Sequence, residues 1–271
     1  MLKKIYGIFK LIFNFYIIWL IKYYFSKNKK QGRLNAKEEQ ANYADYIFRN
    51  YLLDDIKING HAKNDKFKIN LVMVNHFSTI DFLIIVSILR HFNMNKYYFI
   101  YKESIIKVPI LGSLSLDDIR ITRDWVSDQE LINNQLKNID NGTIIIYPEG
   151  TRYDKKKHAE SKKFCFENKL PIFNYTLTPK AKGTHYLLKL LKKQNKLGNV
   201  YDITLILPGF INKDFYITNL LNFKELGTLY VYCNEIDIKE EDMNYDKFKY
   251  KLYMIWLNKN FLFDKLIKSK Y

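Results

Sequence analysis

The sequence predicts an α/β protein in which a sheet is flanked by helices. Short apolar runs typical of strands alternate with longer segments typical of helices, which is the pattern of a sheet covered on both faces. The 271 residues are 48% hydrophobic and 16% aromatic, so the chain can bury a sizeable core and is not disordered. Ten glycines and two cysteines exclude a Gly-rich linker, a disulfide framework and a four-cysteine zinc site.

The charge balance predicts an anionic partner. Lys and Arg number 44 against 28 Asp and Glu, which gives a formal net charge of +16. An excess of this size fits nucleic acid, an anionic membrane surface or a phosphorylated substrate. No nucleic-acid-binding module is recognisable, so we expect no nucleic-acid partner.

Residues 1–37 are predicted to form a basic, hydrophobic membrane anchor or interfacial helix. They contain nine Lys or Arg and no acidic residue, and residues 5–25 are strongly apolar. The uncharged run Leu11–Ile21 has 11 residues, whereas a spanning helix needs about 20. A short tilted span with snorkelling lysines, a helix lying in the interface, and a helix buried in the globular domain all remain open. We expect membrane attachment.

The flanks of this apolar segment suggest where the rest of the chain lies. No small-residue cleavage site follows the segment, which argues against a cleaved signal peptide. Lys27, Lys29, Lys30 and Arg33 follow it directly and favour a cytosolic body.

Residues 38–271 are expected to form one domain, because we find no internal repeat and no boundary after residue 40. Apolar, β-rich runs predict strands at 69–74, 96–101, 142–147, 173–177, 202–207 and 228–238. Longer periodic segments predict helices at about 38–56, 82–92, 127–138, 159–168 and 247–271. Ser127 is the expected cap of the third helix, with Glu130 three residues on. Polar residues 59–66 predict a loop, and 108–112 a break.

The first candidate site is the segment from Asn75 to Asp81, which lies between an apolar strand and an apolar helix. Strand ends are where sites form in α/β sheets. His76 in the turn and Asp81 in the first helical turn can converge, and the carboxylate would then make the imidazole a general base. Ser78 and Asp81 also have the spacing of a capping box, and both interpretations can hold together.

The second candidate site is Tyr147-Pro148-Glu149-Gly150-Thr151-Arg152, at another strand end. Gly150 permits a tight turn whose amides can face an anion, and the Arg152 guanidinium suits a phosphate. Taken alone, the segment could equally be a turn before a solvated charge run. Two further basic segments, 119–124 and 177–183, are weak evidence by themselves.

Together these segments resemble the glycerolipid acyltransferase family, which acylates lysophosphatidate and related lysophospholipids from acyl-CoA. Asn75-His76 through Asp81 resembles the family's Asn-His-x4-Asp block, and Glu149-Gly150-Thr151-Arg152 its Glu-Gly-Thr-Arg block. Arg123 resembles the arginine of the second block, and Pro179 the proline of the fourth. The resemblance extends from about residue 60 to the C-terminal end. The segments 123–125, 148–158 and 179–183 are most similar to the eukaryotic subgroup with lysocardiolipin and lysophosphatidylinositol acyltransferases.

The resemblance implies a glycerolipid-acyltransferase-like α/β fold, with a mixed sheet flanked by helices and an N-terminal membrane-associating helix. It also implies an acyl-CoA-dependent O-acyltransferase that converts a lysophospholipid to a diacyl phospholipid. The expected acceptor is 1-acyl-sn-glycerol 3-phosphate. His76 would be the general base, with Asp81 stabilising its charged form. Arg152, Gly150 and Thr151 would hold the acceptor phosphate, Arg123 would add to the pocket, and Glu149 would position the turn. Acyl-CoA is a co-substrate, and we expect no cofactor and no metal.

Two departures from the family pattern stand out. The second block usually has glycine six residues before its arginine, where this chain has Asp117, so the shape of the acceptor pocket is the open point. The eukaryotic subgroup often continues into a C-terminal membrane segment, which this sequence lacks before Tyr271. We therefore expect attachment mainly through the N-terminus, at an endomembrane such as the endoplasmic reticulum if the source is eukaryotic, with the catalytic domain cytosolic.

Three alternative functions remain open. One is a remodelling acyltransferase acting on lysocardiolipin or lysophosphatidylinositol. Another is a CoA-independent transacylase, since the same His-x4-Asp chemistry would serve. The third is a non-enzymatic basic protein that binds anionic membranes, with binding that falls steeply with salt.

Overall fold

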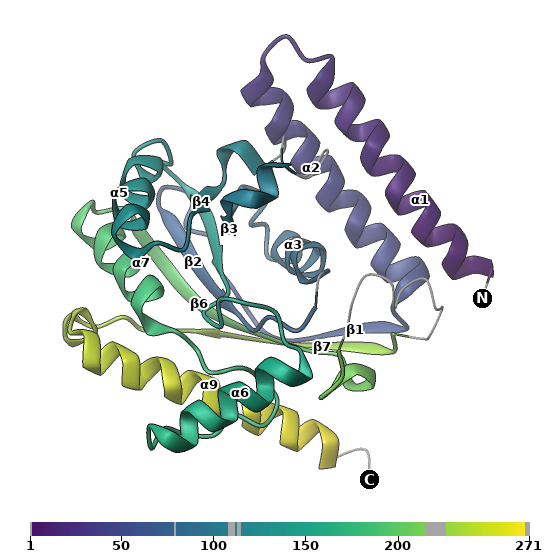
Figure 1. Ribbon diagram of the computed structural model, residues 1–271. Helices are drawn as coiled ribbons and strands as arrows, with labels where there is room; N and C mark the ends of the chain where they lie inside the picture. The colour runs from purple at the N-terminus through teal and green to yellow at the C-terminus, as the bar shows by residue number, and fades with distance from the viewer. Residues whose placement is uncertain (1, 79, 108–111, 113–114, 215–225, 269–271) are drawn as a thin grey trace.

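The computed structural model describes residues 2–78, 80–107, 112, 115–214 and 226–268. A seven-stranded sheet runs through the centre in the order β1-β7-β6-β2-β5-β3-β4, as the ribbon in Figure 1 shows. The strands are β1 (Asp55–Gly60), β2 (Ile69–Val74), β3 (Tyr97–Lys102), β4 (Ile119–Ile121), β5 (Gly142–Ile146), β6 (Leu197–Ile206) and β7 (Thr228–Glu235). The helices are α1 (Leu2–Ile18), α2 (Lys29–Ile47), α3 (Asp81–His91), α5 (Trp125–Leu136), α6 (Lys155–Glu167), α7 (Ala181–Lys193) and α9 (Tyr245–Lys268).

The sheet is mixed, which confirms the predicted fold class. The pairs β4–β3, β3–β5, β5–β2, β2–β6 and β1–β7 are parallel, whereas β6 and β7 pair antiparallel. The carboxyl ends of β2, β5, β3 and β4 therefore meet at one edge of the sheet, the place where α/β folds build sites.

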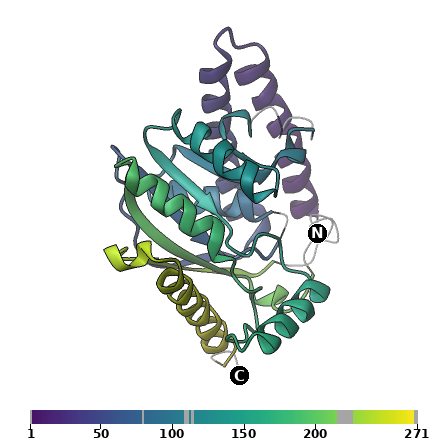
Figure 2. The same cartoon turned by 60° about the vertical axis from the view of Figure 1, so that its left-hand side comes forward.

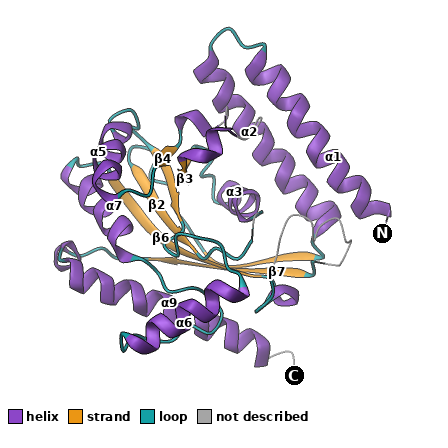
Figure 3. Ribbon diagram, in the orientation of Figure 1, coloured by secondary structure: helices purple, strands orange, loops and turns teal. Residues whose placement is uncertain are grey.

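Helices cover both faces of the sheet, as Figures 1 and 3 show. Alternate residues of β2 point to opposite faces: Val72 and Val74 pack in a core with α2 and α3, and Leu71 and Met73 pack in a second core with α5, α7 and α9. All six β2 residues are buried, so the strand reads as a continuous apolar run.

The N-terminal segment forms a helical hairpin. Helix α1 continues into a π-helical turn, Trp19–Tyr24, and α2 returns alongside it, as the rotated view in Figure 2 also shows. Asn14 Nδ2 donates to the Tyr43 hydroxyl at 2.8 Å and joins the two helices. Within the described part of the chain, no helix combines the length and the apolar character that a bilayer crossing requires.

Several expected elements differ from those observed. The helix expected from residue 38 begins at Lys29, so α2 runs through the position where we expected the domain to start. Residues 59–66 were expected to be a loop, but Asn59 and Gly60 end the edge strand β1, which pairs with β7. Helix α7 was not anticipated, and the expected break at 108–112 lies outside the described residues except for Gly112.

The predicted strand at 173–177 is wrong, because this segment is irregular. Its amides are satisfied by side chains: Tyr175 N donates to Asn260 Oδ1, and Leu177 N to Glu149 Oε2. The predicted Ser127 cap is also wrong. Asp124 caps α5 by accepting from Ser127 N at 2.9 Å, and the helix begins at Trp125.

Candidate active site

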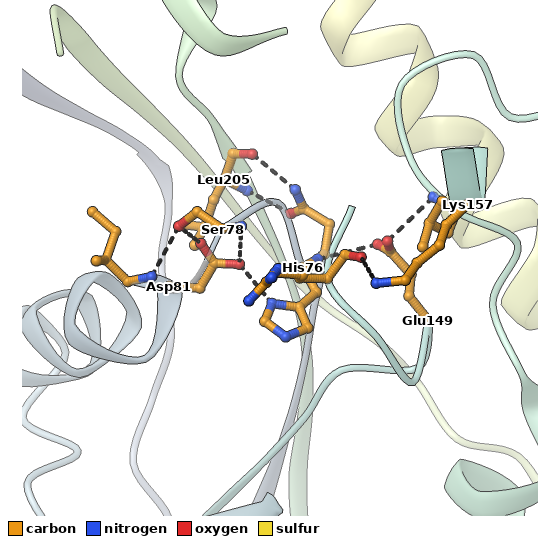
Figure 4. A network of polar contacts seen from close by, with 10 residues as sticks. His76, Ser78, Asp81, Glu149, Lys157 and Leu205 are labelled. Atoms are coloured by element: carbon orange, nitrogen blue, oxygen red, sulfur yellow. Dashed lines mark hydrogen bonds and ion pairs between the residues drawn. The ribbon is translucent and has the colours of Figure 1, made fainter. Parts of the chain in front are cut away.

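His76 and Asp81 meet at the carboxyl end of β2, as Figure 4 shows. The His76 Nδ1 atom lies 2.8 Å from Asp81 Oδ2. Strand β2 ends at Val74 and α3 begins at Asp81, so the intervening turn folds the imidazole back onto the first residue of the helix. The Asp81 carboxylate is fully buried, while the His76 side chain is 25% exposed. With Nδ1 facing Asp81, Nε2 is the nitrogen that can accept a proton.

The Asp81 carboxylate also organises the turn that holds it. It accepts from Ser78 N at 3.0 Å and from the Ser78 hydroxyl at 2.5 Å (Figure 4). The Ser78 hydroxyl in turn accepts from Ile80 N at 3.1 Å. Asp81 therefore fixes the turn before α3 and contacts His76 at once. The N-cap of α3 is Ile80, without a side-chain cap bond, so the expected capping box of Ser78 and Asp81 is not formed.

Asn75 and Glu149 fix the backbone on either side of His76. The Asn75 amide exchanges two hydrogen bonds with the Leu205 backbone, at 2.8 and 2.9 Å, and locks the end of β2 to β6. Glu149 accepts from His76 N and, with its other oxygen, from Leu177 N, each at 3.2 Å. Burial raises the pKa of Glu149 to about 8. Glu149 therefore acts as a bridge between two loops.

Tyr147 supports the imidazole from beside it. Its ring stacks on His76 with centroids 4.3 Å apart and planes inclined by 26°. Burial raises the pKa of the Tyr147 phenol well above its ordinary value. The stacked ring and the Asp81 carboxylate therefore hold the imidazole from two sides.

His76 lies on the wall of a cavity of about 790 Å³. Its lining includes aromatic and aliphatic side chains, among them Phe82, Phe99, Tyr101 and Ile105. It also includes the basic side chains of Arg123, Arg152, Lys157, Lys180 and Lys182. Such a cavity can take an amphiphile with an anionic head and an apolar chain.

Arg123 is held in an unusual backbone conformation. Its φ is +75°, in the left-handed region that bulky residues avoid. Asp128 stabilises this conformation by accepting from Thr122 N at 2.6 Å and from Arg123 N at 3.0 Å. The strained loop aims the guanidinium at the second site, where Arg123 Nη2 donates to Gly150 O at 3.4 Å.

The structure divides the residues singled out from the sequence into two groups. One group lines the cavity and consists of His76, Arg123, Gly150, Thr151 and Arg152. The other group is buried behind the cavity wall and consists of Asn75, Asp81, Glu149 and Pro179. Pro179 was expected among substrate-binding residues, but it is absent from the described cavity lining.

Sequence reasoning missed three residues of the site. The sequence indicates only a capping role for Ser78, but its hydroxyl donates a hydrogen bond to the Asp81 carboxylate. The sequence indicates only that Tyr147 ends a strand, but its ring stacks on the imidazole of His76. The segment 177–183, which contains Lys180, is weak evidence by itself. The signal that could have identified Lys180 is a basic residue directly after a strand-like run, next to Pro179.

Comparison with known proteins agrees with this geometry. Residues 56–178 match the family model described as Acyltransferase. Probable 1-acyl-sn-glycerol-3-phosphate acyltransferase 5 of Arabidopsis thaliana is 30% identical over 142 residues, covering 50% of this chain and 37% of the relative. The human 1-acyl-sn-glycerol-3-phosphate acyltransferase delta is 28% identical over 192 residues, covering 68% of this chain and 50% of the relative. The aligned regions thus span half or less of these relatives.

The crystal structure of the 1-acyl-sn-glycerophosphate (LPA) acyltransferase PlsC from Thermotoga maritima has a similar fold. Its TM-score is 0.58 at 17% identity, and the match covers 96% of this chain and 95% of that chain. The resemblance of the His76 and Glu149 segments to acyltransferase blocks is therefore confirmed by the family match over 56–178. Residues 56–178 thus match the Acyltransferase family model, and the chain has a fold similar to that of the Thermotoga maritima enzyme.

Proposed function

We propose that this chain is an acyl-CoA-dependent O-acyltransferase that converts a lysophospholipid to a diacyl phospholipid, with 1-acyl-sn-glycerol 3-phosphate as the acceptor. The observation that carries the proposal is the 2.8 Å contact between His76 Nδ1 and Asp81 Oδ2, because His76 lines a cavity with both basic and apolar side chains in its wall. The names of the relatives, all 1-acyl-sn-glycerol-3-phosphate acyltransferases, point to the same reaction class.

In this proposal, His76 Nε2 removes the proton from the free glycerol hydroxyl as its oxygen attacks the thioester carbonyl carbon. The tetrahedral intermediate then collapses, the C–S bond breaks, and the CoA sulfur leaves and takes the proton from the imidazolium. The products are an ester and free CoA thiol. Asp81 stabilises the imidazolium through Nδ1–H. General-base assistance of this kind contributes about 10²–10⁴ in rate.

In this proposal, basic side chains of the cavity wall bind the acceptor phosphate. Arg123 and Arg152 supply planar guanidinium groups that match phosphate oxygens. Holding the phosphate places the acceptor hydroxyl near His76 and converts a bimolecular encounter into an oriented one. Glu149 and Asn75 act behind the wall, by fixing the backbone of the turns.

We infer that α1 attaches the protein to an anionic membrane surface, such as an endomembrane facing the cytosol. Four of its exposed aromatic residues recur at intervals of three and four along one helix face: Tyr6, Phe9, Phe13 and Tyr16. This face suits the headgroup boundary. A Phe9→Ser, Phe13→Ser double variant should lose flotation with phosphatidylserine vesicles; undiminished flotation contradicts the inference.

The test of the function is an acceptor screen. The purified chain in mixed micelles receives labelled oleoyl-CoA with lysophosphatidate, lysophosphatidylinositol, lysocardiolipin or glycerol 3-phosphate in separate reactions. We expect a labelled diacyl product with lysophosphatidate that disappears in His76→Ala. A product formed equally by His76→Ala overturns the mechanism. Acyl transfer only from a phospholipid donor, without CoA, identifies a transacylase instead.

A further inference from the structure

Two basic side chains from separate elements approach Gly150, and a third lines the same cavity. Arg123, from the loop before α5, donates to Gly150 O at 3.4 Å. Arg152 follows two residues later on the same turn and lines the same cavity. Lys180, at the start of α7, lies over the turn so closely that a methyl group on Gly150 would sit 3.5 Å from its Cδ and 3.6 Å from its Nζ. The three residues all line the cavity that His76 lines.

The position of Lys180 is fixed through its backbone. Lys180 N donates to Pro148 O at 2.7 Å, which joins this residue to the turn that carries Gly150. The preceding Pro179 restricts the chain at this point, because its φ is fixed by its ring. Pro179, which does not line the cavity, thus contributes by placing Lys180. Helix α7 begins one residue later, at Ala181, and the positive end of its dipole lies on the same side.

Three carboxylates from this part of the chain are engaged with other groups. Glu149, adjacent to Gly150, accepts from His76 N and Leu177 N. Asp128 accepts from the backbone of Thr122 and Arg123, and Asp154 pairs with Lys157 at 2.9 Å. Across the described residues, neither Arg123 nor Lys180 forms an ion pair with a carboxylate. Arg123 and Lys180 can therefore meet an incoming anion without giving up an ion pair to a described carboxylate.

We propose that Lys180 is a third binding residue for the acceptor phosphate, beside Arg123 and Arg152, and that it makes the site selective for a terminal phosphomonoester. This rests on the proposed function. A phosphomonoester presents three oxygens and close to two negative charges at neutral pH, which match three cationic side chains. A phosphodiester such as lysophosphatidylinositol presents two free oxygens and one charge. Lys180 therefore stabilises the monoester more than the diester.

The experiment compares Lys180→Gln, Lys180→Arg and Lys189→Gln with the wild-type chain. Lys189 is an exposed lysine of the same helix outside the described cavity lining, so it controls for general charge loss. KM and kcat are measured separately for oleoyl-CoA, lysophosphatidate, lysophosphatidylinositol and monoacylglycerol. Circular dichroism of each variant verifies the fold.

We expect Lys180→Gln to raise KM for lysophosphatidate by about tenfold or more, the usual effect of losing a hydrogen bond to a charged group. KM for oleoyl-CoA should stay unchanged, Lys180→Arg should restore most of the affinity, and Lys189→Gln should behave as the wild type. The effect should be smaller with lysophosphatidylinositol and absent with monoacylglycerol.

A rise in KM for oleoyl-CoA alone overturns the proposal, because Lys180 would then bind the phosphates of CoA. Equal losses with lysophosphatidate and monoacylglycerol also overturn it, since they would reflect a general defect. A wild-type chain that acylates no acceptor refutes the proposed function itself, whereas an active wild type with an unaffected Lys180→Gln variant refutes only the role of Lys180.

Discussion

Arg33 and Asp117, 84 positions apart in the sequence, form two parallel hydrogen bonds at 2.6 and 2.7 Å. Asp117 stands where the acyltransferase pattern usually has glycine, and the structure gives this departure a partner in α2. The next residue, Asp118, is buried and bonds Lys37 Nζ at 2.6 Å. Ser115 and Asp118, on either side of Asp117 in the sequence, line the cavity. The pairs Arg33–Asp117 and Lys37–Asp118 therefore attach α2 to a segment of the cavity wall.

The Arg33–Asp117 pair should contribute measurably to stability. We expect a double-mutant cycle with Arg33→Gln and Asp117→Asn to give a coupling energy of about 1–3 kcal/mol in urea unfolding, because the contact is bidentate and largely shielded from water. The control is Lys163 and Glu167, an exposed pair at 3.8 Å, which should couple by no more than about 0.5 kcal/mol. Equal couplings in the two cycles would contradict a structural role for Arg33–Asp117.

Arg123→Gly should impair binding of the acceptor without lowering the free energy of unfolding. Glycine adopts a φ of +75° without strain, so the free energy of unfolding should hold or rise by up to about 1 kcal/mol. Loss of the guanidinium should raise KM for lysophosphatidate by about tenfold or more. The matched control is Lys169→Gly, at φ +53° just after α6, which should show the stability effect with unchanged kinetics. A strongly destabilised Arg123→Gly chain would show that the arginine supports the fold.

Tyr147→Phe should leave activity nearly intact. The Tyr147 hydroxyl is buried and has no hydrogen-bond partner within the described part of the structure. Removing it should raise the free energy of unfolding by up to about 1–2 kcal/mol, because an unsatisfied buried hydroxyl is costly. The ring that stacks on His76 remains, so kcat should change by less than about twofold, whereas Tyr147→Ala should lower it. A large loss of kcat in Tyr147→Phe would instead assign the hydroxyl a role in the reaction.

The protonation of buried Glu149 should make the free energy of unfolding fall as the pH rises. Its pKa is raised by burial from 4.5 to about 8, so between these values the folded chain binds a proton that the unfolded chain has released. The contribution of Glu149 to the free energy of unfolding is fully present below about pH 4.5. It is lost as the pH rises toward 8, by at most about 1.4 kcal/mol per pH unit. In urea unfolding, the stability difference between wild type and Glu149→Gln should shrink over this range. A constant difference would show that Glu149 is ionised throughout.

The sequence predicted the central strands and the His76 site because their signals are local. Residues 69–74 form an uninterrupted apolar run, and the spacing from His76 to Asp81 limits how the turn can fold. The helix at 82–92 and the strands at 142–147 and 202–207 were confirmed for the same reason. The family resemblance of the His76 and Glu149 segments is confirmed by the match over residues 56–178.

The features that the sequence did not predict depend on tertiary contacts. Edge strand β1 has exposed polar positions, and only its pairing with β7 makes it a strand. Residues 173–177 have the composition of a strand, but Glu149 and Asn260 take up their amides. The convergence of Lys180 on Gly150 joins positions 30 residues apart, and no local pattern encodes it.

The central claim is that His76 and Asp81 act as one unit, and a kinetic double-mutant cycle tests it most directly. His76→Ala, Asp81→Asn and the double variant are assayed with saturating oleoyl-CoA and lysophosphatidate. We predict that His76→Ala lowers kcat by about 10²–10⁴, and that adding Asp81→Asn to it costs little more, because the carboxylate acts through the imidazole. Multiplicative losses, or a His76→Ala variant with wild-type kcat, would contradict the account.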